Sequence, residues 1–360
     1  MPVFAGTNCV ELNNRLNEQE YAARAICLRS SPRAVFLQMD GPCNHDCLFC
    51  SRPVAYRYFN LDDYRRRFAA KIDPIIAAAE RLNLTGSGEL LLLPQARENL
   101  TYFNQFVHTE KMFATNGSSL TPKMIDFIAA SGNRYVIHVS LHAANEILHA
   151  RMAGAHTYKA VLSNLEYVRK IKATISTLRV NYIFVATTEN IKDLPAFVHF
   201  AAEHGADAVV AYYNYVYRLD QKALSCYFAQ DLTNDMIDQA LAVAKDCNLT
   251  IHLPPKFHQA SYPRETICGE VWSNLMINTE GDIITCDVAG DSRESINGKS
   301  FDEVWNGEYY SRLRSLLKTG NHACSSACFR ANPSVVNDFR SHFITRGKTP
   351  EEIAEFLAGS

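Results

Sequence analysis

The sequence predicts an α/β fold: a partial (β/α)6 barrel of the TIM type, followed by a small extension built from a β-hairpin and helices. Short apolar segments alternate with helical segments from residue 34 to about residue 213, which is typical of a parallel sheet with helices outside it. Several of these strands end in polar residues, as in barrels whose chemistry lies at the carboxyl ends. Farther along, two short strand segments flank the turn Glu280-Gly281-Asp282 and predict the hairpin.

The expected elements follow one another in a regular order. The strands are expected at 34–40, 89–93, 111–115, 135–142, 178–186 and 208–213, with the hairpin strands at 275–278 and 283–285. The helices are expected at 14–30, 61–82 (broken or kinked near Pro74), 122–130, 158–171, 194–204 and 233–246. Four parts follow from this order: an N-terminal helical segment (1–33), the barrel (34–254), the hairpin extension (255–330) and a helical tail (331–360). The main boundary is expected at the prolines within 254–264.

Composition indicates a folded chain that neither binds nucleic acid nor spans a membrane. Of the 360 residues, 47% are hydrophobic and 21% are charged, and the net charge is −2. The densest basic run, residues 65–67, suits a solvated helix face. No apolar stretch approaches the roughly 18–20 residues of a membrane span, and no signal peptide is visible, so we expect a cytoplasmic protein. In that reducing compartment, the 11 cysteines are expected to be ligands or buried thiols.

Three cysteines near the N-terminus are spaced as ligands of one metal cluster. Cys43, Cys47 and Cys50 lie in the segment CNHDCLFC, directly after the first expected strand. A [4Fe–4S] cluster usually takes four cysteine ligands, so three leave one iron open. An open coordination site is typical of a catalytic centre, whereas a structural site is normally closed. The alternative is a zinc site that takes His45 as its fourth ligand.

This segment closely resembles the signature of the radical S-adenosylmethionine (radical SAM) superfamily. The resemblance implies that the amino and carboxylate groups of SAM bind the open iron. It also implies that one electron, supplied by a reductant such as flavodoxin or ferredoxin, cleaves SAM to a 5′-deoxyadenosyl radical. Phe49 matches the superfamily position that packs near the adenine.

Later segments resemble further superfamily motifs in the expected order. The cofactor-binding residues implied by this resemblance are Phe49, Gly86, Ser87, Gly88, Glu89, Thr115, Asn116, Ser140 and Arg151. Residues 86–89 take the place of a Gly-Gly-Glu motif, in which glycines let the backbone approach SAM closely. Ser140 matches a position that contacts the SAM carboxylate, and Arg151 is expected to support that end.

Polar side chains on the barrel strands are candidate substrate contacts. Side chains alternate across a strand, so His138 shares a face with Ser140, and Arg179 shares a face with Asn181. The candidates for substrate contact are His138, Arg179, Asn181 and Tyr213, the last at the end of the sixth strand. For each, ordinary packing or hydrogen bonding within the fold is the alternative.

Four later cysteines form a second group. Cys268, Cys286, Cys324 and Cys328 suffice for one more [4Fe–4S] cluster. The stretch from Gly281 to Cys286 resembles the Gly-x-x-x-x-Cys hairpin of SPASM and Twitch extensions, which bind auxiliary iron–sulfur clusters. The full SPASM pattern has more cysteines, for two clusters, so the one-cluster Twitch type fits better. A zinc site made of the four cysteines is the alternative.

The resemblance implies abstraction of a hydrogen atom but does not identify the substrate. We expect a small polar metabolite such as a sugar, an aminocyclitol or a nucleoside-like compound, because only 33 residues precede the first strand, too few for the leader-recognition domain of many peptide maturases. Oxidation and epimerisation are both open; Cys226 and Cys247 are candidate hydrogen donors, and Asp287 is a candidate base. The alternatives are modification of a peptide or protein side chain and, in a different class, a non-catalytic iron–sulfur or zinc protein.

Overall fold

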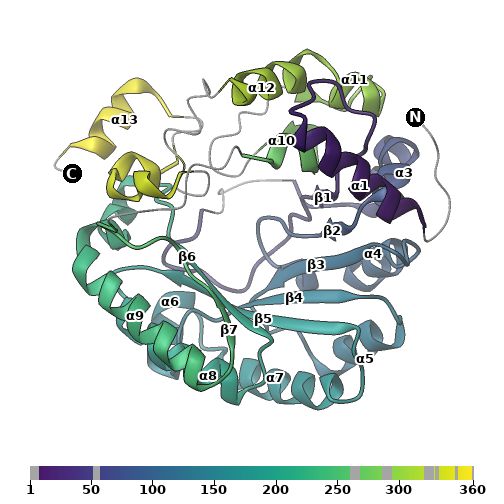
Figure 1. Ribbon diagram of the computed structural model, residues 1–360. Coiled ribbons are helices and arrows are strands. Elements are labelled where there is room, and N and C mark those ends of the chain that lie inside the picture. The colour runs from purple at the N-terminus through teal and green to yellow at the C-terminus, as the bar shows by residue number, and fades with distance from the viewer. Residues whose placement is uncertain are drawn as a thin grey trace.

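The protein is built around one curved sheet with helices on its outer face (Figure 1). This computed structural model describes residues 8–51, 57–259, 268–285, 294–319, 328, 332–344 and 348–358. Among the residues singled out from the sequence, Cys286, Asp287 and Cys324 lie outside the described part of the chain, as do residues 260–264 of the expected boundary at 254–264.

The sheet confirms the partial parallel barrel and joins the hairpin extension to it directly. The barrel strands are β1 (Ala34–Leu37), β2 (Arg81–Asn83), β3 (Glu110–Thr115), β4 (Tyr135–Ser140), β5 (Leu178–Ala186), β6 (Ala208–Tyr213) and β7 (Thr250–His252). They lie side by side in chain order and all pair in parallel. On the other side of β1 lies β8 (Asn274–Ile277), also parallel, followed by the antiparallel β9 (Asp282–Ile284) and β10 (Glu294–Ser295). The extension therefore continues the barrel sheet.

The helices cover the outer face of the sheet and its β1 end (Figure 1). In the barrel they are α2 (Leu61–Tyr64), α3 (Ala70–Ala78), α4 (Ala96–Phe103), α5 (Pro122–Ala130), α6 (Glu146–Ala153), α7 (Tyr158–Lys172), α8 (Leu194–Glu203) and α9 (Gln230–Asp246). Outside it are α1 (Asn8–Ala22), α10 (Glu270–Ser273), α11 (Phe301–Trp305), α12 (Glu308–Lys318) and α13 (Pro350–Leu357). No helix in the described part of the chain is long and apolar enough to cross a membrane.

The second strand is the main error in the predicted element order. The expected strand at 89–93 is a 3-10 turn, Leu90–Leu92, and β2 lies at Arg81–Asn83, where the sequence predicted the end of a long helix. A three-residue buried strand is too short to show a period of two, whereas an apolar run such as LLL fits either a strand or a buried turn. The expected helix at 61–82 is divided by a π-helical turn, Arg65–Ala69, and α3 runs through Pro74.

Buried polar groups hold the extension against the N-terminal segment. The indole of Trp272 donates to the Ala25 carbonyl at 2.8 Å, and that of Trp305 donates to the Ser30 carbonyl at 2.9 Å. Arg314 is fully buried and donates to the carbonyls of Ile26 and Trp305. A buried charge is costly unless hydrogen bonds compensate it, so these contacts fix the extension at the β1 end of the barrel.

The C-terminal segment returns to the other side of the barrel, next to β6. Val216 pairs with Phe343 through two backbone hydrogen bonds, Val216 N to His342 O (2.8 Å) and Ile344 N to Val216 O (3.0 Å). The side chains of Val216, Phe339, Phe343 and Phe356 form a small apolar cluster there. The segment that follows β6 is thus covered on its outer side.

Candidate active site

The cysteine loop, residues 43–50, lies at the carboxyl end of β1 beside the stretch of residues 86–89. Two backbone hydrogen bonds join these segments, Gly41 N to Ser87 O and Glu89 N to Pro42 O, both 2.8 Å. Gly88 has a φ of +93°, and a Cβ there would lie 1.9 Å from the Gly41 oxygen. A glycine is therefore required at residue 88 so that this turn can approach the backbone leading into the cysteine loop.

Glu89 connects the same turn to the end of β3. Its buried carboxylate accepts from the Thr115 hydroxyl at 2.8 Å and from the Asn116 amide at 2.7 Å. Burial raises the pKa of Glu89, while the hydrogen bonds from Asn116 and Thr115 oppose that shift. The Asn116 side chain in turn donates to the Asn44 side chain at 2.8 Å, within the cysteine loop. Three of the expected cofactor-binding residues thus form one hydrogen-bonded network with the loop.

The loop also binds the C-terminal end of α6. The amides of Asp46 and Leu48 donate to the carbonyls of Ala153 and Met152, both at 3.0 Å. These carbonyls belong to the last turn of the helix, where carbonyls lack an intrahelical partner. Gly154 ends the helix with φ +60°, and a Cβ there would lie 2.3 Å from the Asp46 oxygen. The loop therefore takes the place of a further helical turn.

His45, the fourth ligand of the zinc alternative, is buried away from such a role. Its Nε2 lies 2.8 Å from the hydroxyl oxygen of Thr157, at the start of α7. Burial, with the nearby His149 as a smaller cause, lowers the pKa of His45 to about 4. Because Nε2 is already hydrogen-bonded to Thr157, this contact argues against His45 as a zinc ligand through that nitrogen.

Two residues missed at the sequence level hold the far end of the loop. Gln221 donates from Nε2 to the carbonyls of Leu48 (3.3 Å) and Cys50 (3.1 Å). Arg218 donates to the Cys50 carbonyl at 3.2 Å and pairs with Asp220. Both lie on the segment after β6, some 170 residues from the loop, and nothing local in the sequence indicates this contact.

The ring of Phe49 lies against the end of β4. It meets the ring of His142 edge to face, with centroids 4.9 Å apart. His142 has a φ of +62°, and its Nδ1 accepts from the Val185 amide at 3.1 Å. Burial lowers the pKa of His142 to about 3, so the ring is a neutral acceptor. Phe49, expected to pack near the adenine, is thus held beside the strand that carries Ser140.

The substrate candidates divide between the barrel interior and other places. On β4, His138 and Ser140 are half-buried on the interior face, and Asn181 of β5 lies 3.4 Å from His138 Nε2. Burial, with the charge of Arg81 as a smaller cause, lowers the pKa of His138 to about 4. A neutral imidazole and an amide therefore lie together inside the barrel.

Two other candidates do not lie there, and a cofactor candidate is exposed. Arg179 pairs with Glu110 at 2.7 Å at the amino ends of the strands, the end opposite the cysteine loop. Tyr213 is only 2% exposed, because its ring packs on Phe257 outside the barrel and its hydroxyl donates to the Pro255 carbonyl. The tyrosine with an open side chain is its neighbour Tyr212. Arg151 is exposed on α6 and forms an ion pair with Glu189.

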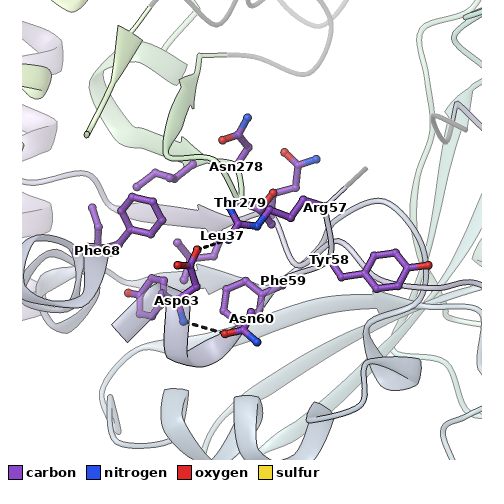
Figure 2. Close-up of a pocket in the computed structure, with 13 residues that line it drawn as sticks. Leu37, Arg57, Tyr58, Phe59, Asn60, Asp63, Phe68, Asn278 and Thr279 are labelled. Carbon is purple, nitrogen blue, oxygen red and sulfur yellow. Dashed lines mark hydrogen bonds and ion pairs between the residues drawn. The ribbon is translucent and has the colours of Figure 1, made fainter. Parts of the chain in front are cut away.

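The hairpin extension lies close to the cysteine loop side of the barrel. Figure 2 shows a pocket between the end of β1, the segment that precedes α2 and the turn after β8. Its lining includes Gln38, Arg57, Phe59 and Asn278. Of the later cysteines, Cys268 is half-buried and Cys328 is buried, whereas Cys286 and Cys324 lie outside the described residues.

The donor set fits an iron–sulfur cluster, because three cysteines lie on one short loop. Cys43, Cys47 and Cys50 are half-buried on one loop. Among the described side chains, no three of the His, Cys, Asp and Glu type are arranged to hold a metal ion. A cluster would be held by these three cysteines on a backbone that Asn116, Ala153 and Gln221 already fix.

Comparison with known families decides what this loop is. Residues 42–201 match the radical SAM superfamily, and residues 268–330 match SPASM, an iron–sulfur cluster-binding domain. The chain belongs to the radical SAM superfamily. Its cofactors are SAM and the [4Fe–4S] cluster of that superfamily, and its SPASM domain is of a kind that binds auxiliary iron–sulfur clusters.

Solved structures support the same fold over most of the chain. Streptococcus suis SuiB bound to S-adenosylmethionine is 15% identical, with a TM-score of 0.61 over 84% of this chain and 70% of SuiB. The anSMEcpe protein with bound AdoMet and Cp18Cys peptide is 12% identical, with a TM-score of 0.61 over 90% of this chain and 95% of its own. AdoMet-dependent heme synthase of Methanosarcina barkeri is 25% identical over 182 residues, which are 48% of this chain and 50% of that relative. The chain thus spans half the length of this relative.

Proposed function

We propose that this radical SAM enzyme abstracts a hydrogen atom from a side chain of a peptide or protein. The bound cluster and SAM supply the radical, and the protein positions one C–H bond and excludes water. This proposal reverses the preference for a small polar metabolite that the sequence suggested, and it concerns the substrate class rather than the cofactor chemistry.

The observation that carries the proposal is a set of three exposed apolar side chains, on the cysteine loop, at the end of β6 and on the segment after β6 that contacts the loop. Leu48 is 38% exposed on the loop itself, Tyr212 is 40% exposed at the end of β6, and Leu219 is 37% exposed just after it. Exposed apolar side chains on these segments can contact the apolar parts of a peptide, whereas a sugar has little apolar surface to match them.

Deeper in the barrel, the side chains suit recognition of one polar group. His138 and Asn181 are hydrogen-bonded to each other. Ser140 lies on the same face of β4, two residues closer to its carboxyl end. A neutral imidazole, an amide and a hydroxyl can bind an amide, hydroxyl or thiol group without requiring a charge. We assign His138 and Asn181 to substrate contact and Ser140 to the SAM carboxylate.

Similar structures support the peptide class. One is SuiB bound to its precursor peptide SuiA, with a TM-score of 0.61 over 84% of this chain, and another is anSMEcpe with a bound peptide. Both likenesses are in fold, at identities of 14% and 12%. The similarity to a heme synthase over 182 residues favours a second candidate, a small molecule larger and less polar than a sugar.

The test is transfer of deuterium from the substrate to 5′-deoxyadenosine. Anaerobically reconstituted protein is incubated with SAM, dithionite and peptides encoded near its gene, prepared with deuterated side chains. We expect deuterated 5′-deoxyadenosine that forms only with peptide, together with a change in peptide mass. Transfer from a tetrapyrrole, sugar or nucleoside and none from any peptide would contradict the proposal.

A pair of histidine variants tests whether His138 contacts the substrate. His138→Leu is expected to lower peptide-dependent deuterium transfer at least about tenfold, because the imidazole beside Asn181 is lost. His199→Leu is the control, because His199 is exposed on α8 and pairs with Glu203 of the same helix. Equal activity of both variants would remove His138 from the substrate site.

A further inference from the structure

A chain of hydrogen bonds links the cysteine loop to the end of β4 through two helices. His45 Nε2 lies 2.8 Å from the Thr157 hydroxyl oxygen. That oxygen lies 3.3 Å from His149 Nε2, and His149 Nδ1 lies 3.0 Å from the Leu141 carbonyl oxygen. His45 and His149 are buried, and neither ring has a role in the proposed reaction.

The Leu141 carbonyl determines which group donates and which accepts in each of these hydrogen bonds. A carbonyl can only accept, so His149 Nδ1 carries the proton, and Nε2 of the neutral ring is an acceptor. The Thr157 hydroxyl therefore donates to His149, and its oxygen accepts from His45 Nε2–H. Each group makes the one bond that its neighbour requires, and the ring of His45 is held in a single tautomer and orientation.

Thr157 departs from the usual behaviour of a threonine at its position. It is the N-cap residue of α7, where a threonine side chain normally accepts from a backbone amide of the first turn and stabilises the helix. The Thr157 side chain makes no such bond, whereas the side chain of Asn145, the N-cap of α6, accepts from the Leu148 amide at 2.9 Å. The hydroxyl of Thr157 binds the two histidines instead of its own helix.

At the cysteine-loop end of this series of hydrogen bonds, the backbone of His45 contacts a sulfur atom. The backbone amide of His45 donates to Cys43 Sγ at 3.4 Å. Hydrogen bonds to cluster sulfurs raise the reduction potential of an iron–sulfur cluster, because they stabilise the added negative charge. The orientation of the His45 peptide, and with it this N–H···S contact, depends on where the buried ring is held.

We propose that Thr157 is a positioning residue that, through the ring of His45, keeps the His45 amide on the Cys43 sulfur and so raises the reduction potential of the cluster. The proposal rests on the cluster at Cys43, Cys47 and Cys50, and is independent of the substrate class.

The test compares Thr157→Val with Thr157→Ser in the anaerobic holoprotein without SAM. Valine keeps the shape and removes the hydroxyl, whereas serine keeps the hydroxyl. Because Thr157 does not cap α7, the valine variant loses no capping bond. The readouts are the iron content and the midpoint potential of the cluster in a redox titration followed by EPR.

We expect Thr157→Val to lower the ratio of reduced to oxidised cluster about tenfold at a fixed solution potential, which is about 59 mV for one electron. Thr157→Ser is expected to stay near the wild type. His149→Leu breaks the chain one bond farther out and is expected to give a smaller shift of the same sign, which also serves if the valine variant does not fold. Loss of iron from Thr157→Val but not from Thr157→Ser would also support the proposal.

Two outcomes would overturn it. One is an unchanged potential in a fully loaded Thr157→Val variant. The other is an equal shift in the valine and serine variants, since the hydroxyl would then not be responsible. Neither outcome bears on the peptide proposal, which the deuterium experiment tests separately.

Discussion

The cysteine loop and the hairpin turn after β8 are both fixed to the barrel, but by different kinds of contact. Mostly neutral, partly buried hydrogen bonds hold the loop. Asn116 and Gln221 donate to it, its amides donate to the carbonyls of Met152 and Ala153, and Arg218 is a charged donor to Cys50. Charged side chains hold the hairpin turn: Arg67 donates to the Glu280 carbonyl at 2.8 Å, and Arg57 pairs with Glu280 at 3.3 Å.

This difference indicates which region has a demanding geometry. Hydrogen bonds are directional and costly to leave unmade where they are shielded from water, so the partly buried bonds of the loop fix the backbone that carries the three thiols. Exposed ion pairs are worth about 0–1 kcal/mol, are screened by salt and tolerate small shifts. The contacts of the radical SAM site therefore fix its backbone geometry more strictly than those of the hairpin turn do.

Gly154→Ala is expected to have the largest effect, because it acts on the loop. The left-handed backbone costs about 1–2 kcal/mol with a side chain, and contact with the Asp46 oxygen adds about 1–3 kcal/mol of overpacking. We expect a lower unfolding midpoint together with reduced iron in the site, measured by thermal unfolding and metal analysis.

Gly132→Ala is the matched control for this prediction. Gly132 has a similar φ of +66°, but a Cβ there meets nothing within 4 Å. It therefore incurs only the backbone cost and is expected to retain its iron. Equal iron loss in the two variants would show that the contact between the loop and α6 is unimportant.

Acid is expected to weaken the loop side through His142. Its folded pKa of about 3 lies below the usual value near 6.5, so the unfolded chain binds the extra proton and stability falls as the pH drops from about 6.5 toward 3. By pH 5 the free energy of unfolding is lower by about 2 kcal/mol through this residue. The pKa values of Asp40 and Glu89 are raised by burial and contribute with the opposite sign.

His142→Asn isolates this contribution. Asparagine tolerates the left-handed backbone and can accept from the Val185 amide, but it does not titrate. Stability measured by urea unfolding between pH 7 and pH 5 should therefore change less in the variant than in the wild type. An identical pH dependence in both would contradict the assigned role of His142.

The smallest effect is expected at the hairpin. Burial opposes the charged form of Asp63, but the hydrogen bond from Arg67 and the nearby charge of Arg57 outweigh it and lower the pKa of Asp63. Arg67→Leu is expected to lower the free energy of unfolding by about 1 kcal/mol at low salt. In high salt, where ion pairs are screened, the difference from the wild type should be much smaller. The control is Arg65→Leu, since Arg65 lies over the Tyr102 ring and pairs with the exposed Asp62, without an ion pair to the hairpin turn among the described residues. Thermal unfolding at low and high salt checks both, and a salt-independent loss larger than that at Gly154 would reverse the comparison.

Sequence patterns predicted the barrel well where elements are long and periodic. The strands Leu178–Ala186 and Ala208–Tyr213 and the helix Pro122–Ala130 have the expected bounds. Alternation also identified the face of His138 and Ser140. Alternation shows which face of a strand a side chain is on, but not how far along the strand the site lies. Arg179 was therefore expected in the site, although this residue is near the amino end of β5.

The errors within the site have a common cause. β6 reads AVVAYY and is apolar on both faces, so the pattern does not distinguish Tyr212 from Tyr213. The contacts that hold the cysteine loop join residues 112 and 171 positions apart, as in His45 with Thr157 and Cys50 with Gln221. Such contacts leave almost no local trace, and only the glycine after α6 and the threonine before α7 hint at them.

We infer that Cys43, Cys47 and Cys50 hold a cluster whose fourth iron is free to bind SAM. The most direct measurement is the EPR spectrum of the reduced, oxygen-free wild-type protein before and after addition of SAM. We expect SAM to change the spectrum of the cluster at Cys43, Cys47 and Cys50. A spectrum that SAM leaves unchanged, or zinc bound at these three cysteines, would rule out a SAM-binding cluster at this site.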